Sequence, residues 1–163
     1  RQNKVHIEAV PLQALIERGL RGVPRPEGIE VVTDNPLGER PLEVDPDQLT
    51  QVLVNLISNA YTAMGERGTL TVSTRDDGEK VRLTVGDTGV GIPPEHFSKL
   101  FEPFFTTRKG GKGNGLGLAV SYGIIKMHRG DIKVTSNVDP AAGPTGTAFT
   151  LVLPWTSEEG SRG

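Results

Sequence analysis

Two asparagines are the first residues in this sequence whose type and spacing are typical of a binding site. Asn55 and Asn59 are four residues apart in a stretch with helical periodicity, so they lie on one face of the expected helix. Their amides could offer oxygens to a hard cation or N–H groups to phosphate. Two surface asparagines would give the same pattern, although asparagine is a poor helix former. These residues alone leave both interpretations open.

An aspartate follows an expected strand. Asp87 continues the alternating apolar positions of residues 81–85, so its carboxylate is expected to point inward. A buried carboxylate is costly unless it is hydrogen-bonded, and an adenine amino group is a suitable donor. Gly89 and Gly91 would open a backbone pocket beside it. A turn aspartate that caps Thr88 or Gly89 is the alternative, and from these residues alone it is favoured.

A basic loop precedes a glycine-rich helix start. Arg108, Lys109 and Lys112 are followed by Gly-Asn-Gly-Leu-Gly-Leu at 113–118. Backbone N–H groups and the helix dipole at such a start attract phosphate. The glycine spacing also resembles a dinucleotide-binding fingerprint, but that motif needs a strand directly before it, and residues 104–112 do not form one. A solvated linker is the remaining alternative.

The hydrophobic pattern predicts the elements that must position these residues. Asp45 is expected to cap a long helix, with Pro46 in its first position and Gly65 at its end. Residues 76–78, Asp-Asp-Gly, are expected to form a hairpin turn. The expected helices are 10–20, 46–64, 94–101 and 116–127, and the expected strands are 29–33, 42–44, 69–74, 81–85, 132–136 and 147–153. This order predicts an α+β two-layer sandwich, with helices on one face of a mainly antiparallel sheet.

Composition restricts the class of protein. A length of 163 residues suits one domain, and a net charge of −2 gives no basic field for nucleic acid. The absence of cysteine excludes a disulfide scaffold. No apolar run approaches the roughly 20 residues that span a bilayer, and no signal peptide opens the chain. We therefore expect a cytoplasmic fragment without direct membrane contact, cut from a longer parent whose membrane anchoring stays open.

The motifs occur in an order that resembles the ATP-binding catalytic domain of bacterial two-component sensor histidine kinases. The similarity covers residues from about 29 to 154, and five weak motifs in the family's order make it specific. The similar motifs are 55–60 (N box), 87–92 (first glycine box), 101–107 (F box), 113–118 (second glycine box), and 127–132 followed by 146–149 (final strand pair). The expected organisation is a linker with a short helix at 1–28, an ATP-binding catalytic domain at 29–157 and a flexible tail at 158–163.

The resemblance implies the Bergerat ATP-binding fold, which gyrase, the Hsp90 chaperones and the MutL mismatch-repair proteins share. It implies that Asp87 binds the adenine amino group, that Asn59 coordinates Mg²⁺, and that Asn55 is a second contact to Mg²⁺ or phosphate. Gly89 and Gly91 would shape the adenine pocket, and residues 101–117 would form a mobile lid. The other nucleotide-binding residues that it implies are Thr62, Ile92, Phe105, Thr107, Arg108, Lys109, Gly113, Gly115, Leu116, Gly117, Leu118 and Thr147, the last near the base or its water.

One position separates the branches of this superfamily. Its hydrolysing members carry a glutamate base where this chain has Asn55, which cannot accept a proton at neutral pH. The resemblance therefore implies transfer of the γ-phosphoryl group of ATP to a histidine on a separate helical hairpin domain of the same kinase. The phosphoryl group would pass on to a response regulator receiver domain, and the parent kinase would be a homodimer.

The sequence departs from the family pattern in two ways. Thr62 stands where many members carry a lysine that contacts phosphate. None of the three histidines, His6, His96 and His128, has the setting of a phosphoacceptor, and we expect all three to be structural. The alternatives are an anti-sigma-factor serine kinase, which the F box weighs against, and a degenerate ATP sensor with a scaffolding role, which the intact glycines and asparagines weigh against.

Overall fold

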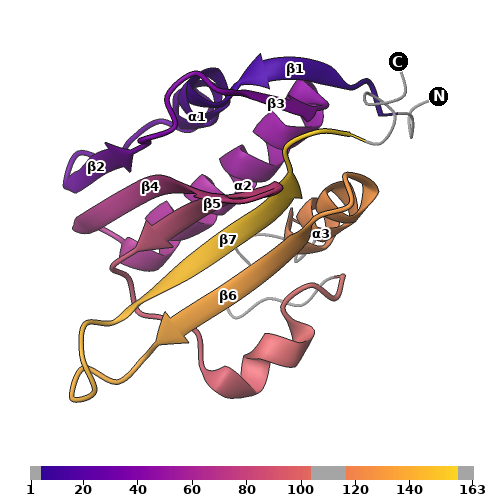
Figure 1. Cartoon of the computed structure of the whole chain (residues 1–163). Coiled ribbons are helices and arrows are strands. Elements are labelled where there is room, and N and C mark those ends of the chain that lie inside the picture. Colours follow the sequence, from indigo (N-terminus) through magenta and orange to yellow (C-terminus); the bar gives the residue numbers. More distant parts are fainter. Residues whose placement is uncertain (1–4, 104–116, 158–163) are drawn as a thin grey trace.

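The computed structural model describes residues 5–103 and 117–157, and these residues form helices and strands in mixed order along the chain (Figure 1). They are β1 (Glu8–Pro11), α1 (Leu12–Arg21), β2 (Ile29–Asp34), β3 (Pro41–Val44), α2 (Pro46–Met64), β4 (Gly68–Asp77), β5 (Lys80–Asp87), the 3-10 helix η1 (Pro94–Lys99), α3 (Gly117–Met127), β6 (Asp131–Asn137) and β7 (Gly146–Pro154). The predicted helices and strands are therefore present, with shifts at their ends.

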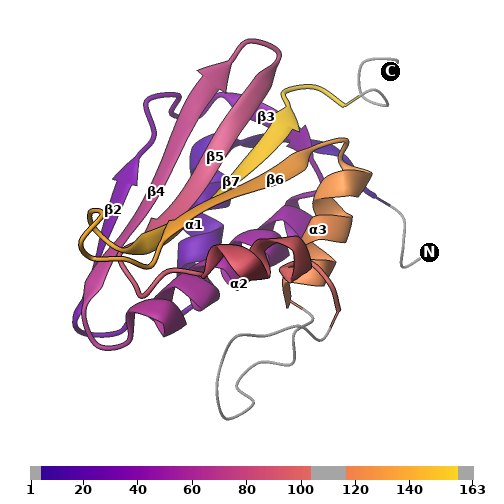
Figure 2. The same cartoon turned by 90° about the horizontal axis from the view of Figure 1, so that it is seen from below.

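Five strands form the main sheet in the order β2-β4-β5-β7-β6. The pair β2–β4 is parallel, and the other three pairs are antiparallel. Helices α2 and α3 lie on the same face of this sheet (Figure 2), while β1 and β3 form a separate two-stranded sheet. The predicted α+β sandwich, with helices on one face of a mixed, mainly antiparallel sheet, is confirmed.

Helix α2 is bounded by the residues that the sequence predicted. Oδ1 of Asp45 accepts hydrogen bonds from the backbone N–H groups of Asp47 (3.1 Å) and Gln48 (3.2 Å), which satisfies two donors of the first turn. Pro46 occupies the first helical position, and Gly65 ends the helix with φ at 70°.

Among the described residues, no helix combines the length and apolarity needed to cross a membrane.

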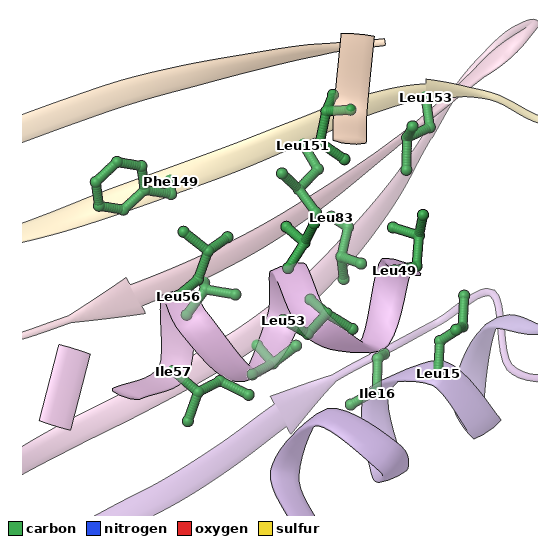
Figure 3. Close-up of a cluster of buried hydrophobic side chains, with 14 of the residues drawn as sticks. Leu15, Ile16, Leu49, Leu53, Leu56, Ile57, Leu83, Phe149, Leu151 and Leu153 are labelled. Atoms are coloured by element: carbon green, nitrogen blue, oxygen red, sulfur yellow. The ribbon is translucent and has the colours of Figure 1, made fainter. Parts of the chain in front are cut away.

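The core lies between the helices and the sheet. Helix α2 packs its apolar stripe, including Leu53 and Leu56, toward Leu83 of β5 and Leu151 of β7 (Figure 3). Alternate residues of β4, β5 and β7 face this layer, and they are buried from Leu70 to Thr74, from Val81 to Val85 and from Thr147 to Leu153; the alternation in the sequence predicted this for β4 and β5. Helix α1 adds Ile16 to the same cluster, together with other apolar residues of its inner face. This core holds α2 at a fixed position over the sheet.

Three local predictions were wrong. Residues 8–11 form strand β1, paired with β3, so the first helix begins at Leu12 and not at residue 10. Asp76 and Asp77 are not turn residues, because they pair with β5 and leave Gly78 and Glu79 as the turn. The helix expected at 94–101 is a 3-10 helix that ends at Lys99. The boundaries proposed for the domain, at residues 28 and 157, stay a prediction.

The N-terminal end of α2 is closed by hydrogen bonds from distant residues. His128 is buried; its Nε2 accepts from the backbone N–H of Asp45 (3.0 Å), and its Nδ1 lies 2.8 Å from the carbonyl oxygen of Ile124. With Nε2 accepting, Nδ1 is the ring nitrogen that can donate to the carbonyl oxygen of Ile124. The indole N–H of Trp155 donates to Asp76 at 3.0 Å at the same end of the sheet. His128 is therefore structural, as expected.

Candidate functional site

At the opposite end of the sheet, three polar residues form one cross-strand row. Asp87 of β5 pairs with Thr147 of β7, and Thr147 pairs with Ser136 of β6. Side chains of directly paired residues project from the same face of a sheet. The row next to them on this face is apolar and consists of Val85, Phe149 and Val134. The three polar residues therefore end an otherwise hydrophobic surface, which is an uncommon place for them without a partner.

Asp87 uses one of its two carboxylate oxygens within the described structure. Its Oδ1 accepts from the backbone N–H groups of Gly89 (2.8 Å) and Thr147 (3.2 Å). Burial raises the pKa of Asp87, and these two hydrogen bonds lower it without cancelling that effect. The sequence left two alternatives for Asp87, a turn aspartate that caps Gly89 and a carboxylate that points inward. The structure shows both features in this residue. Among the described residues, no donor lies on Oδ2.

Two glycines let the loop after β5 pack tightly on both sides. A Cβ on Gly89 would lie 2.6 Å from the carbonyl oxygen of Ala63, near the end of α2. Gly91 has φ at 84°, and a Cβ there would overlap the carbonyl group of Asn137 at the end of β6. The loop is therefore clamped between α2 and β6, where only glycine fits. This packing explains the predicted glycines and holds Asp87 in place.

Ser136 joins the loop to β7 and was not predicted as a site residue. Its Oγ accepts from the backbone N–H of Ile92 (2.7 Å), donates to the carbonyl oxygen of Gly146 (2.8 Å), and lies 2.8 Å from Oγ1 of Thr147. The signal that could have found it is parity: Ile132 faces inward in the same strand, and Ser136 continues that alternation. A serine on the inner side of a strand needs polar partners.

The two asparagines lie on the face of α2 that connects α3 with the Asp87 loop. Asn55, Asn59 and Ala63 follow one another at intervals of four residues, so they share one face of the helix. Asn55 donates from Nδ2 to Ser121 Oγ in α3 at 3.2 Å, while Ala63 contacts the loop at Gly89. The helix face that carries both amides therefore runs toward the carboxylate of Asp87.

The structure describes some of the remaining predicted site residues and leaves the others outside the described ranges. Gly117 opens α3 directly against the side chain of Asn55. Ile92 and Leu118 are partly buried and pack against the core, whereas Thr62 is exposed. The other predicted nucleotide contacts, Phe105, Thr107, Arg108, Lys109, Gly113, Gly115 and Leu116, lie outside the described residues.

The amide and carboxylate side chains at this end of the sheet are chemically suited to a purine nucleotide with a magnesium ion. No group of three or more histidine, aspartate or glutamate side chains that could hold a metal occurs among the residues that the structure describes. Mg²⁺ needs few protein ligands when phosphate oxygens complete its shell, and amide oxygens such as those of Asn55 and Asn59 are suitable donors. The open oxygen of Asp87 fits an exocyclic amino group.

A hollow of about 490 Å³ lies on the other face of the sheet and is a weaker candidate. Threonine, glycine and alanine dominate its lining, with Thr71, Gly86 and Ala148 among them. Asp87 is the one ionisable residue in that lining, and its strand parity directs the carboxylate to the face that carries the helices. The hollow thus offers no charged group for chemistry.

Comparison with known proteins agrees with this geometry. Residues 44–157 match the family described as histidine kinase-, DNA gyrase B-, and HSP90-like ATPase. The chain is 37% identical over 153 residues to the sensor histidine kinase ZraS of Escherichia coli (strain K12), covering 91% of this chain and 31% of that protein. It therefore spans less than a third of the length of that relative.

Two solved structures show the same architecture. The mycobacterial sensor histidine kinase MprB superposes with a TM-score of 0.81 at 31% identity, covering 93% of this chain and 99% of that one. The histidine kinase ThkA, solved in complex with the response regulator protein TrrA, gives a TM-score of 0.74 at 28% identity and covers 93% of this chain and 42% of that one. The chain belongs to the histidine kinase-, DNA gyrase B-, and HSP90-like ATPase family, as a catalytic ATP-binding domain of the sensor histidine kinase type.

Proposed function

We propose that this domain binds Mg-ATP at the Asp87 end of the sheet and donates the γ-phosphoryl group to a histidine on a separate helical hairpin domain of the same kinase. The phosphoryl group then passes to the receiver domain of a response regulator; the domain works in the cytoplasm, and the parent kinase is a homodimer. The sensor kinases among the relatives support this proposal, as does the complex of ThkA with its regulator.

One observation carries the choice of transfer over hydrolysis. The single carboxylate of α2 is Asp47, which lies in the first turn and pairs with Arg18 at 3.0 Å. Near the site this helix offers amides, at Asn55 and Asn59. Activation of water requires a general base within hydrogen-bond reach, and an amide cannot serve. The helix can therefore position phosphate without directing water against it.

The side chains divide the work between base and phosphates. Asp87 accepts a hydrogen bond from the adenine amino group through Oδ2, and the loop at Gly89 and Gly91 keeps that carboxylate in place. Asn59 and Asn55 hold Mg²⁺, which when bound neutralises charge on the phosphates. Arg108 and Lys109 are proposed to add positive charge beside the γ-phosphate. Little covalent chemistry is required of this domain, because the acceptor histidine is itself the nucleophile.

Labelling in trans tests the proposal. The chain is incubated with Mg-ATP labelled at the γ-phosphate, with and without a phosphoacceptor hairpin, and a hairpin whose acceptor histidine is replaced by alanine is the control. Acid-labile label is expected on the intact hairpin and little on the chain. Tethering the hairpin raises its effective concentration to about millimolar and should speed labelling.

The same experiment separates the alternatives. Acid-stable label on the chain's own serines would favour a serine kinase. Rapid release of inorganic phosphate without the hairpin would favour an ATPase. Failure to bind Mg-ATP at all would favour a scaffold, and each of these results would refute the transfer mechanism.

A further inference from the structure

The hydroxyl group of Ser136 has a fixed set of hydrogen-bond roles. A serine hydroxyl has one proton to donate and can accept twice. Its proton goes to the carbonyl oxygen of Gly146, since a carbonyl can only accept, and one acceptor site takes the N–H of Ile92. The contact with Oγ1 of Thr147, at 2.8 Å, is then a hydrogen bond only if Thr147 is the donor.

This count fixes the direction of the Thr147 hydroxyl. Its proton is used toward Ser136, so toward any other group Oγ1 can only accept. The neighbouring Asp87 also offers an acceptor, because the described residues use Oδ1 alone. The polar row at this end of the sheet therefore presents acceptors and no side-chain donor.

We infer that Ser136 is a positioning residue that sets the base specificity of the site, by keeping the Thr147 hydroxyl from donating. The inference rests on the proposed function, because it requires a purine base at the Asp87 end. A 6-aminopurine places its amino group, a donor, against the acceptors of Asp87 and Thr147. A 6-oxopurine places an oxygen acceptor at that position and carries a donor, N1–H, where the 6-aminopurine has an acceptor. The selected ligand class is 6-aminopurine nucleotides.

Removal of the Ser136 hydroxyl should relax this selection. In Ser136→Ala, Oγ1 of Thr147 loses the acceptor for its proton and can turn to donate to the oxo group of an incoming base. The N–H of Ile92 also loses its partner, so affinity for both kinds of nucleotide should fall together. A change in the ratio of the two affinities therefore measures the effect of Ser136 on base specificity. An equal fall in both affinities measures only its structural contribution.

Calorimetric titration with Mg-ATP and Mg-ITP measures that ratio. The wild-type chain should prefer ATP by about a hundredfold, and Ser136→Ala should reduce the preference by about tenfold, the usual scale of one mismatched polar pair. Ser136→Thr keeps a hydroxyl and should keep the wild-type ratio. Thr135→Ala removes the neighbouring hydroxyl from the outer face of the same strand and is the matched control.

Thr147→Val tests whether Ser136 acts through Thr147. It removes the acceptor without creating a donor, so its preference for ATP should lie between those of wild type and Ser136→Ala. In the Thr147→Val background, Ser136→Ala should leave the ratio unchanged. Thermal unfolding of each variant identifies any that fail to fold. If Ser136→Ala does not fold, Thr147→Val carries the decision, and a wild-type ratio there overturns the inference.

The outcomes separate this inference from the proposed function. Equal affinity of the wild-type chain for ATP and ITP, or no binding, would refute the assignment of Asp87 to the base. A strong wild-type preference that survives in Ser136→Ala, with both affinities reduced equally, would leave that assignment intact and overturn the role of Ser136.

Discussion

Asp45 and Asp87 lie at opposite ends of the fold and are hydrogen-bonded in different ways. Asp45 uses both carboxylate oxygens: Oδ1 caps α2, and Oδ2 accepts from the backbone N–H of His6 at 2.9 Å. Asp87 uses only Oδ1 within the described structure. Partial removal from water is costly for both carboxylates, and among the described residues only Asp45 has donors on both of its oxygens.

The pKa values of the two carboxyl groups move in opposite directions. Burial acts to raise the pKa of Asp45, but N–H groups of His6, Gln48 and Asp47 outweigh it and hold the pKa below the ordinary value. Burial raises the pKa of Asp87, and its two N–H donors are not sufficient to reverse this. A charge kept at a cost to folding indicates a functional group, whereas a charge matched by the backbone indicates a structural one.

Among the variants that test the difference between the two aspartates, Asp87→Asn is expected to have the largest effect, and the effect is on ATP affinity. The amide can still accept the N–H bonds of Gly89 and Thr147, but its other atom becomes a donor facing the adenine amino group. ATP affinity should fall by about tenfold to a hundredfold, measured by calorimetry. Stability without nucleotide should be equal to or above wild type, because a desolvated charge is removed. Loss of stability with unchanged affinity would reverse the two roles.

Asp45→Ala should have the opposite effect: it should lower stability and leave ATP affinity unchanged. It leaves the N–H groups of His6, Asp47 and Gln48 without their acceptor, and loss of such a cap costs about 1–2 kcal/mol of unfolding free energy. ATP affinity of the folded variant should stay within error of wild type, because Asp45 lies at the far end of α2. Urea unfolding and calorimetry on the same samples give both numbers. A substantial loss of affinity would contradict the division between the two ends.

The pH dependence of stability should differ in sign between the two aspartates. The folded-state pKa of Asp45 is lowered, so its stabilisation is present above the unfolded value near 3.8 and is lost as pH falls through the folded pKa. The folded-state pKa of Asp87 is raised, so its penalty applies above that pKa and is relieved as pH falls toward 3.8. Urea unfolding between neutral pH and pH 3 measures both contributions against Asp45→Asn and Asp87→Asn.

On acidification, the stability advantage of wild type over Asp45→Asn should shrink. Over the same range, wild type should gain stability relative to Asp87→Asn. Parallel changes for the two variants would show that the two carboxylates are not treated differently by the fold.

The smallest effect is expected at Asp47, two residues after the cap. Its carboxylate is 91% exposed and pairs with Arg18 at the surface. Exposed ion pairs contribute about 0–1 kcal/mol, so Asp47→Asn should change the unfolding free energy by less than Asp45→Ala does. The variant is the matched control for removal of an aspartate from this turn. A loss equal to that of Asp45→Ala would show that charge near the helix start, and not the cap, stabilises α2.

The sequence predicted the parts of the fold that depend on local patterns. The cap at Asp45, the end of α2 at Gly65 and the alternation in β5 follow from side-chain types and their period, and the structure confirms them. Strand β1 was missed because three of its four residues are exposed and because it acquires strand geometry only by pairing with β3. Such long-range pairing has no local signal.

The candidate site divides in the same way. Asp87 and the glycines after it could be found from parity and from local glycine density. Strand parity marks Ser136 as an inward-facing residue, but its partners Ile92 and Gly146 could not be identified from the sequence, because only the fold brings them to its hydroxyl group. The roles of the predicted residues toward ATP and Mg²⁺ stay predictions.

The central claim is that nucleotide binds at the Asp87 end and not at the Asp45 end. Amide proton–nitrogen spectra of the chain, recorded during titration with Mg-ATP, test it residue by residue. The backbone amides of Gly89, Ile92 and Thr147 should shift most, and those of Asp47 and Gln48 should stay in place. Shifts concentrated at Asp47 and Gln48, or no shift at Gly89 and Thr147 when ATP is saturating, would contradict the account.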